Sequence, residues 1–252
     1  MIACVGDVHG QFGPLARLVG ALPPTLPVVQ VGDLVAYPPA PGVRADRHAT
    51  AGRAADRWET LGRPVYFVRG NHDYMPALRG LTAPAEVLPG LVYLPAGVHA
   101  LGGLRVGVLG GAESVDGLAR SRDVDWWPDE EGATAEEFDR LLAGARDARG
   151  VDLLVTHTPP TSVAAAMLRR AGGGTPGGDP PAEADATHEP PPTDMPSAVR
   201  VEQAWRVLGQ PPLVCGHMHR PWREGVIEVL GFLGVTLRTL HHGQVQRPGS
   251  LH

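Results

Sequence analysis

Short apolar runs alternate with amphipathic segments in the first part of the chain. The runs at residues 2–5, 28–31 and 65–68 are strand-sized and apolar along nearly their whole length, which is typical of buried strands. The two segments between them carry apolar residues at helical spacing: Leu15, Leu18, Val19 and Leu22 in the first, and Ala51, Ala54, Ala55, Trp58 and Leu61 in the second. The order strand, helix, strand, helix, strand predicts a partly parallel sheet covered by helices.

The remainder of the chain predicts more strands and further helices. Thr134 and Glu137 have the spacing of a helix capping box. The helices that follow carry apolar faces: Phe138, Leu141, Leu142 and Ala145, then Val201, Ala204, Trp205 and Leu208. Strand-sized runs lie at residues 91–94, 98–101, 104–109, 151–155, 213–215, 226–230 and 235–240, with a hairpin turn at 242–243. This mixture predicts an α/β (α+β) fold.

The length and composition favour one domain over residues 1–252. Within it, residues 172–196 are dominated by Gly, Pro, Ala, Thr and acidic residues. Such a segment cannot bury enough apolar surface to offset its ordering entropy, so we expect a mobile loop there. The two cysteines, Cys4 and Cys215, each lie in an apolar run and are expected to be reduced, buried side chains.

Charge and hydropathy exclude several classes of partner. The longest apolar runs are too short to span a bilayer, and the N-terminal residues lack the layout of a signal peptide. We therefore expect a cytoplasmic protein with no membrane association. The formal net charge is -5 and the pI about 6.1, so no long nucleic acid is expected as a partner. The oligomeric state is left open by the sequence.

Five polar motifs each follow a strand-sized apolar run. They are Gly6-Asp7-Val8-His9-Gly10, Gly32-Asp33, Gly70-Asn71-His72-Asp73, His157, and Gly216-His217-Met218-His219. The carboxyl ends of strands in an open α/β sheet face the ligand crevice. The motifs would therefore deliver carboxylates, imidazoles and an amide to one place, and their glycines allow sharp turns close to it.

The side chains of these motifs suit divalent metal ions. Asp7 and His9 are two residues apart, so in an extended chain both can point toward one ion, and His217 and His219 have the same relation. Asp33 has two oxygens with which to bridge a pair of ions. Oxygen and imidazole donors without thiolates favour Mn, with Fe, Zn, Ni, Co or Mg as alternatives. A two-metal centre lowers the pKa of a bound water and holds phosphoryl oxygens, which favours hydrolysis of a phosphate ester by in-line attack.

The ordered set of motifs resembles the signature of the calcineurin-like metallophosphoesterase superfamily, a group of binuclear metal phosphoesterases: D-x-H, G-D, G-N-H-D/E, a lone His and G-H-x-H. The resemblance implies two mixed β-sheets packed as a sandwich and flanked by helices, with the metal site at the strand C-terminal ends. It implies that His72 is a non-ligand that protonates the leaving group or steadies the phosphate. The implied ligands are Asp7, His9, Asp33 and His219 for one ion, and Asp33, Asn71, His157 and His217 for the other.

One departure from the family pattern concerns the support of His72. Members similar to Ser/Thr protein phosphatases have a second Asp three residues after the Gly-Asp motif, where this chain has Ala36. This difference weakens a protein phosphatase interpretation and leaves Asp73 as the neighbour expected to support His72. Arg69, directly before the Gly-Asn-His-Asp motif, is expected to lie beside the site.

A loop with adjacent tryptophans has two interpretations. Trp126 and Trp127 either cap the substrate, with Arg120 and Arg122 binding phosphate, or one of them packs in the core while the arginines are solvated. The second interpretation is the more common outcome for such residues.

The main functional hypothesis is two-metal hydrolysis of a small phosphomonoester or phosphodiester, including nucleotides, and the expected partner is a small phosphorylated substrate. Two alternatives remain. The chain is a catalytically weak metal-binding scaffold of a protein complex, or it is a nuclease that acts on short nucleic-acid ends. A scaffold would be expected to have lost ligands or the catalytic histidine, whereas this chain keeps all seven ligands and His72.

Overall fold

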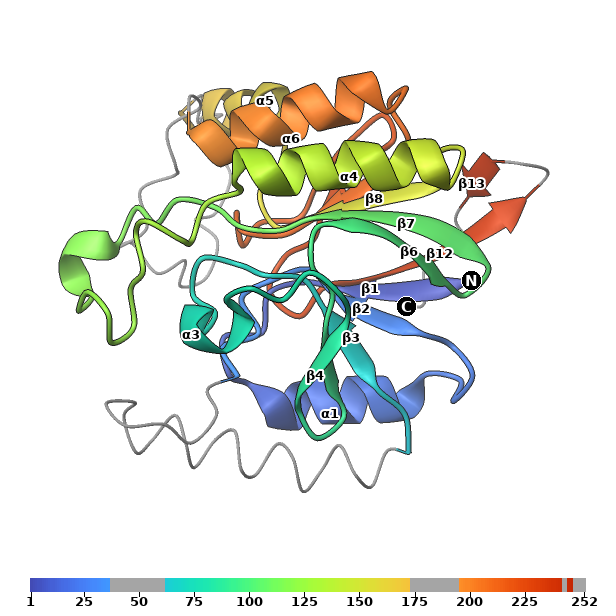
Figure 1. Cartoon of the computed structure of the whole chain (residues 1–252), viewed down its shortest axis with the longest axis horizontal. Coiled ribbons are helices and arrows are strands. Elements are labelled where there is room, and N and C mark those ends of the chain that lie inside the picture. The colour runs from blue at the N-terminus through green and yellow to red at the C-terminus, as the bar shows by residue number, and fades with distance from the viewer. Residues whose placement is uncertain (37–61, 173–194, 242–243, 247–252) are drawn as a thin grey trace, which may run out of the picture.

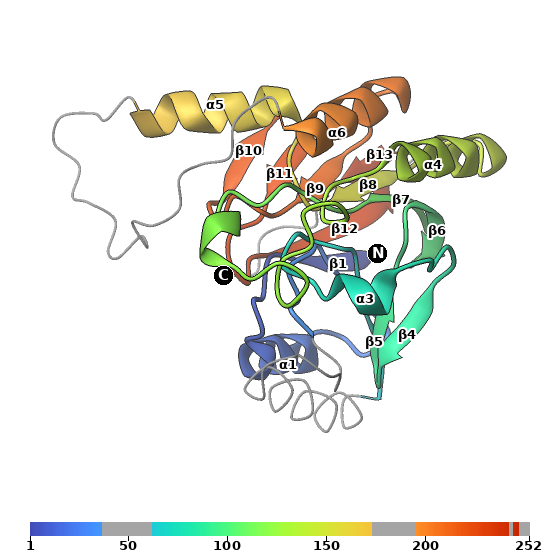
Figure 2. The same cartoon turned by 60° about the vertical axis from the view of Figure 1, so that its left-hand side comes forward.

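Two β-sheets lie face to face between layers of helices in the computed structural model, which describes residues 1–36, 62–172, 195–241 and 244–246 (Figure 1). On the outer face of one sheet lies α1 (Phe12–Ala21). The other sheet is covered by α4 (Ala135–Asp147), α5 (Thr161–Gly172) and α6 (Pro196–Val207), as Figure 2 also shows. The expected sandwich of mixed sheets flanked by helices is confirmed.

The first sheet has the strand order β13-β12-β1-β2-β3-β5-β4. Strands β1, β2, β3 and β5 are parallel to one another, whereas β12, β13 and β4 pair antiparallel on the two sides. The bounds are β1 (Ile2–Val5), β2 (Val28–Gln30), β3 (Val65–Phe67), β4 (Ala85–Leu88), β5 (Leu91–Tyr93), β12 (Val235–His241) and β13 (Gln244–Gln246).

The second sheet has the order β10-β11-β9-β8-β7-β6, again with a parallel centre and antiparallel edges. Its strands are β6 (Gly97–Leu101), β7 (Leu104–Leu109), β8 (Leu153–Thr156), β9 (Leu213–Cys215), β10 (Trp222–Glu224) and β11 (Ile227–Val229). The parallel centres matter for function because they bring the carboxyl ends of several strands to one side of each sheet.

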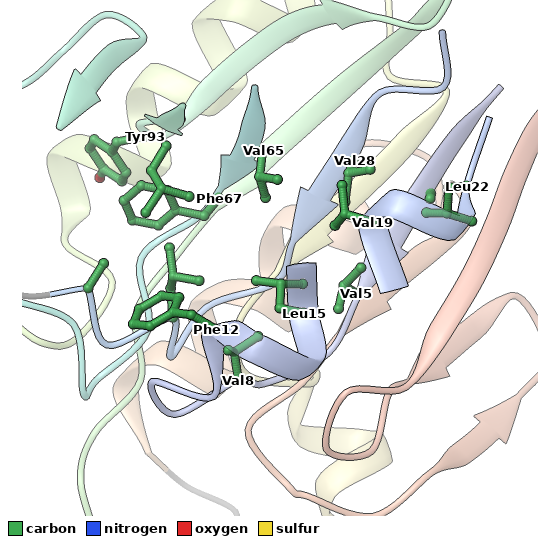
Figure 3. Close-up of a cluster of buried hydrophobic side chains, with 14 of the residues drawn as sticks. Val5, Val8, Phe12, Leu15, Val19, Leu22, Val28, Val65, Phe67 and Tyr93 are labelled. Carbon is green, nitrogen blue, oxygen red and sulfur yellow. The ribbon is translucent and has the colours of Figure 1, made fainter. Parts of the chain in front are cut away.

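The apolar runs are explained by burial on both faces of each central strand. In β1, Ala3 and Val5 pack in the cluster that includes α1, whereas Ile2 and Cys4 pack in a cluster with residues of both sheets. Successive side chains of a strand point to opposite faces, so one run serves two cores. Figure 3 shows the first of these cores, in which Phe12, Leu15 and Val19 of α1 meet Val5, Val28, Val65 and Phe67 of the sheet.

Most of the strands expected from the sequence are confirmed within one or two residues. The edge strands β4 and β10 were not predicted, because both are partly exposed and neither forms a continuous apolar run. The predicted helix over 51–61 lies outside the described residues, as does most of the predicted loop at 172–196, whose first and last residues belong to α5 and α6. Cys4 and Cys215 are free and buried, as expected.

Among the described residues, no helix is both long and apolar enough to cross a membrane.

The capping box at the start of α4 is confirmed, since the Thr134 side chain accepts from the Glu137 N–H and the Glu137 carboxylate accepts from the Thr134 N–H.

The cap of α4 gives a prediction about stability. Thr134→Ala should lower the free energy of unfolding by about 1 kcal/mol, because the Glu137 N–H loses its acceptor. Urea denaturation would measure the change, with Thr25→Ala at an exposed turn position as the control. If both variants unfold with wild-type stability, the cap does not contribute to the start of α4.

Candidate metal centre

The five polar motifs meet because each directly follows a parallel strand. Three of them follow β1, β2 and β3 of the first sheet, and the other two follow β8 and β9 of the second. The two sheets face each other, so the motifs arrive from both sides of the sandwich at the same end. The convergence expected from the sequence is therefore observed.

A first group of donors consists of Asp7, His9, Asp33 and His219, whose ligand atoms all lie within 4.8 Å of one another. His9 Nε2 and His219 Nε2 are 2.9 Å apart, and His219 Nε2 is 3.1 Å from Asp7 Oδ2. Two imidazole nitrogens that converge on each other and on two carboxylates form a donor set that a borderline divalent cation fits.

A second group shares Asp33 with the first and adds His157 and His217, again with ligand atoms within 4.8 Å of one another. Asp33 Oδ2 is 3.4 Å from His157 Nε2, and Asn71 Oδ1 is 3.0 Å from that same nitrogen. Asp33 thus has the shared position predicted for a bridging carboxylate. All seven predicted ligands lie together, and their binding of ions stays a prediction.

The backbone of the motifs is held in an unusual conformation that aims the donors inward. Residues other than glycine rarely adopt positive φ, and when they do so near a site the strain is held by the surrounding fold. The candidate donors in this conformation are His9 (φ 45°), Asp33 (φ 57°), His217 (φ 67°) and His219 (φ 51°).

Two of the motif glycines are required by close approach. A Cβ on Gly70 would overlap the carboxylate of Asp33, and a Cβ on Gly216 would overlap that of Asp7. Each of these two glycines therefore leaves room for a carboxylate that follows a different strand.

Outer hydrogen bonds fix the orientation of several donors. His157 Nδ1 lies 2.9 Å from the carbonyl oxygen of Val31, which assigns the Nδ1 proton to this bond and makes Nε2 the nitrogen that would face an ion. The His217 N–H donates to Asp7 Oδ2 at 3.0 Å, and the His72 N–H donates to Asp33 Oδ1 at 2.8 Å. The carboxylates are thus held by backbone groups as well as by imidazoles.

The expected support of His72 by Asp73 is wrong. The Asp73 carboxylate accepts from the backbone N–H groups of Asp33, Val35 and Gly70, at 3.1, 2.8 and 2.7 Å. Asp73 thus fixes the turn that carries Asp33, because a buried carboxylate satisfies these backbone donors best. Besides Asp33, the acidic group near the His72 ring is Asp116, whose Oδ2 is 3.7 Å from His72 Nε2. Asp116 does not directly follow a strand and belongs to none of the five motifs, so no local pattern of residues pointed to it.

Burial and neighbouring charges shift the pKa values of several donors. Burial lowers the pKa of His217 to about 3. Burial also disfavours the charged form of His157, but the adjacent Asp33 carboxylate raises its pKa to about 9. The desolvation of Asp33 is outweighed by His157 and His72, so its pKa is held well below the usual range. A protonated imidazole beside a buried carboxylate marks a position where positive charge is needed, and a divalent cation can replace that proton.

The tryptophan pair is partly structural. Trp127 is buried, packs with Met75 of α3 (Met75–Leu78) and makes an edge contact with Tyr74 at 5.4 Å. The core interpretation therefore holds for Trp127. Arg122 is exposed and pairs with Asp129.

The two remaining arginines near the site are bonded to the protein. Arg120 was expected to be either solvated or a phosphate-binding residue. Its side chain is only 7% exposed and donates to Ser114 Oγ at 2.7 Å and to the Asn71 carbonyl at 3.2 Å. Arg69 donates to the Gly132 carbonyl at 3.0 Å and to Glu137 at 2.7 Å, so it ties the Gly-Asn-His-Asp motif to the start of α4.

The oxygen and imidazole donors at the ends of the strands of two mixed sheets fit a metal-dependent hydrolase. The chain belongs to the calcineurin-like phosphoesterase family, whose sequence profile matches residues 1–221. A similar solved structure is the Thermus thermophilus sulfate thiohydrolase SoxB in complex with glycerol, at 16% identity and a TM-score of 0.42. That match covers 96% of this chain and 41% of the SoxB chain, so this chain spans less than half the length of SoxB. No protein with a curated description matches the sequence.

The shared position of Asp33 yields a direct prediction. Asp33→Asn should lower the content of both metals and remove turnover, because a neutral amide replaces the carboxylate that both groups of donors share. Metal content after dialysis and hydrolysis rates would measure this. Asp152→Asn is the control, since Asp152 pairs with Arg105 and belongs to neither group. Two tightly held ions and near-normal turnover in Asp33→Asn would refute the bridging assignment.

Proposed function

We propose that this protein hydrolyses small phosphate esters with two divalent ions, Mn in preference to Fe, Zn, Ni, Co or Mg. The observation that carries the proposal is the pair of donor groups that share the Asp33 carboxylate. Asp7, His9, Asp33 and His219 would hold one ion, and Asp33, Asn71, His157 and His217 the other. When bound, such a pair of ions lowers the pKa of a water molecule and offsets the charge that develops on phosphoryl oxygens.

The charge of the site favours an anionic substrate. The two donor groups contain only two carboxylates, those of Asp7 and Asp33. Two divalent ions would therefore leave about two positive charges unbalanced. A phosphate monoester dianion or a phosphodiester anion matches this charge, and both substrate types remain within the proposal.

We propose that His72 acts on the substrate and does not bind an ion. Its ring centre lies 5.0 Å from that of His9, and its Nε2 points to Asp116 at 3.7 Å. In this position it can donate a proton to the leaving oxygen or hold a phosphoryl oxygen. Burial lowers the pKa of His72 to about 4 in the free protein, and a phosphate anion beside it would oppose that shift because it favours the charged imidazolium.

An aromatic side chain borders the donors and supports an organic ester over inorganic phosphate. Phe232 is 39% exposed and stacks on His9, with ring centres 5.7 Å apart and planes 14° apart. An exposed aromatic face beside a charged centre offers apolar contact to the alcohol part of a small ester, including the base of a nucleotide. No long nucleic acid is required as a partner.

The scaffold alternative is disfavoured by the intact donor set, since loss of ligands is what a non-catalytic relative would be expected to show. The nuclease alternative is limited by the formal net charge of -5, which opposes long polyanions but not short ends.

A substrate panel tests the proposal. Phosphomonoesters, phosphodiesters, dinucleoside polyphosphates and cyclic nucleotides should be assayed with Mn, Mg, Ni and Zn. We expect hydrolysis of at least one class, loss of turnover with a chelator and its return with Mn. A protein that binds two ions yet hydrolyses none of these esters would favour the scaffold alternative instead.

The role of His72 gives a prediction that depends on the leaving group. His72→Ala should keep both ions and lose about 10²–10⁴-fold in turnover on alkyl or nucleoside phosphates, since general acid catalysis contributes that much for poor leaving groups. The loss on nitrophenyl esters should be much smaller, because nitrophenolate leaves without a proton. Comparison of kcat for the two ester types measures the difference.

The control for this variant is His99→Ala, because His99 is half-buried and bonds the Pro95 carbonyl at 2.8 Å outside the donor groups. An equal loss on both esters in His72→Ala would point to phosphate positioning, and loss of an ion would make the division of roles between Asn71 and His72 wrong.

A further inference from the structure

Asn71 is the one amide among the candidate ligands, and the orientation of an amide is ambiguous by shape. Its side-chain oxygen and nitrogen are nearly equal in size, but only the oxygen can bind a cation. Asn71 Oδ1 faces His157 Nε2 at 3.0 Å, and Asn71 Nδ2 faces Ser114 Oγ at 2.9 Å. A rotation of the amide by half a turn would present its NH₂ group to the second ion. Whatever fixes the amide therefore controls that metal position.

The hydrogen bonds of Ser114 allow only one orientation of the Asn71 amide. Its hydroxyl carries a single proton, which is donated to a Glu131 carboxylate oxygen at 2.7 Å. The same hydroxyl accepts from Arg120 at 2.7 Å, and the Ser114 N–H donates to the other Glu131 oxygen at 2.7 Å. Since its proton is already used, the Ser114 oxygen can only accept from Asn71. The group that faces it must be the amide NH₂.

We infer that Ser114 is a positioning residue that fixes the amide of Asn71 with its oxygen toward the second ion, and so sets the affinity of that site. This inference rests on the proposed metal centre and adds to it the reason why Asn71 is a competent ligand. Outer hydrogen bonds of this kind orient metal ligands, and their loss typically costs about 10–100-fold in metal affinity.

The surroundings of Ser114 hold it in this position. Glu131 is buried, and its backbone carbonyl accepts from the Ala112 N–H at 3.0 Å, which ties the two ends of the segment between β7 and α4 together. Arg120 adds bonds to the carbonyls of Asn71, at 3.2 Å, and Asp125. This segment includes η1 (Gly117–Ala119) and is drawn in green at the left of Figure 1. It is thus fastened on both sides of the serine.

Direct measurement of metal binding by the full chain tests the inference without relying on activity. Calorimetric titration with Mn²⁺ should give two ions for the wild type. In Ser114→Ala the first ion should bind as in the wild type, and the second should bind about 10–100-fold more weakly. Ser114→Thr keeps the hydroxyl and should restore the second ion. The Mn²⁺ electron paramagnetic resonance spectrum should change from a coupled pair to a single ion at limiting metal.

The chain offers a matched control in Ser162. Its hydroxyl donates to Glu202 Oε2 at 2.7 Å and its N–H donates to the same oxygen at 3.1 Å, so it repeats the serine–glutamate pair of Ser114 without a contact to a candidate ligand. Ser162→Ala should leave both Mn²⁺ affinities unchanged. Glu131→Gln should weaken the second ion like Ser114→Ala, because the new amide can donate to Ser114 and free its proton.

A double variant separates positioning from general support of the fold. If Ser114 acts through the amide, Ser114→Ala combined with Asn71→Ala should bind the second ion no more weakly than Asn71→Ala alone. Unchanged affinity for the second ion in Ser114→Ala, or additive losses in the double variant, would overturn the inference. A wild-type chain that binds no Mn²⁺ would instead overturn the metal centre itself, and the inference with it.

Discussion

The buried carboxylate of Asp33 is the constraint on which the site depends. Asp33 is 1% exposed, and a buried charge is costly unless it is paired and hydrogen-bonded. Its Oδ1 accepts the His72 N–H, while its Oδ2 lies 3.5 Å from His9 and 3.4 Å from His157. Asp73 holds the turn beneath it. The divalent ions that we propose would offset this charge, which lies between two groups of imidazoles.

The pairing of two sheets supplies partners to that carboxylate from opposite directions. Asp33 follows β2 of one sheet, whereas His157 follows β8 of the other, and the bond from His157 to the Val31 carbonyl joins the two strand ends. Behind this bond, Val31 and Val155 pack in the apolar cluster shared by both sheets. The spacing of the sheets is therefore set by side-chain packing, and the distance between the two groups of donors is set with it.

The segment between β7 and α4 has a different part in the function, because it supports the motifs without belonging to one. Ser114 bonds the amide of Asn71, Asp116 lies near His72, and the guanidinium of Arg120 is within 3.6 Å of Asp116 while it also bonds Ser114. This one segment therefore contacts both the proposed ligand Asn71 and the proposed proton donor His72. Changes there can alter the chemistry while all seven donors stay in place.

Local sequence determined most strands, the start of α4 and the candidate donors, because side-chain periodicity, caps and the residues that follow a strand are properties of neighbouring positions. It did not reveal the edge strands, and it assigned the wrong partner to His72. Only the tertiary structure decided that Asp73 serves the backbone near Asp33 and that Ser114 faces Asn71, across 40 and 43 positions of the chain. Such contacts depend on how two sheets and a long connection pack together, and no local pattern of residues carries that information.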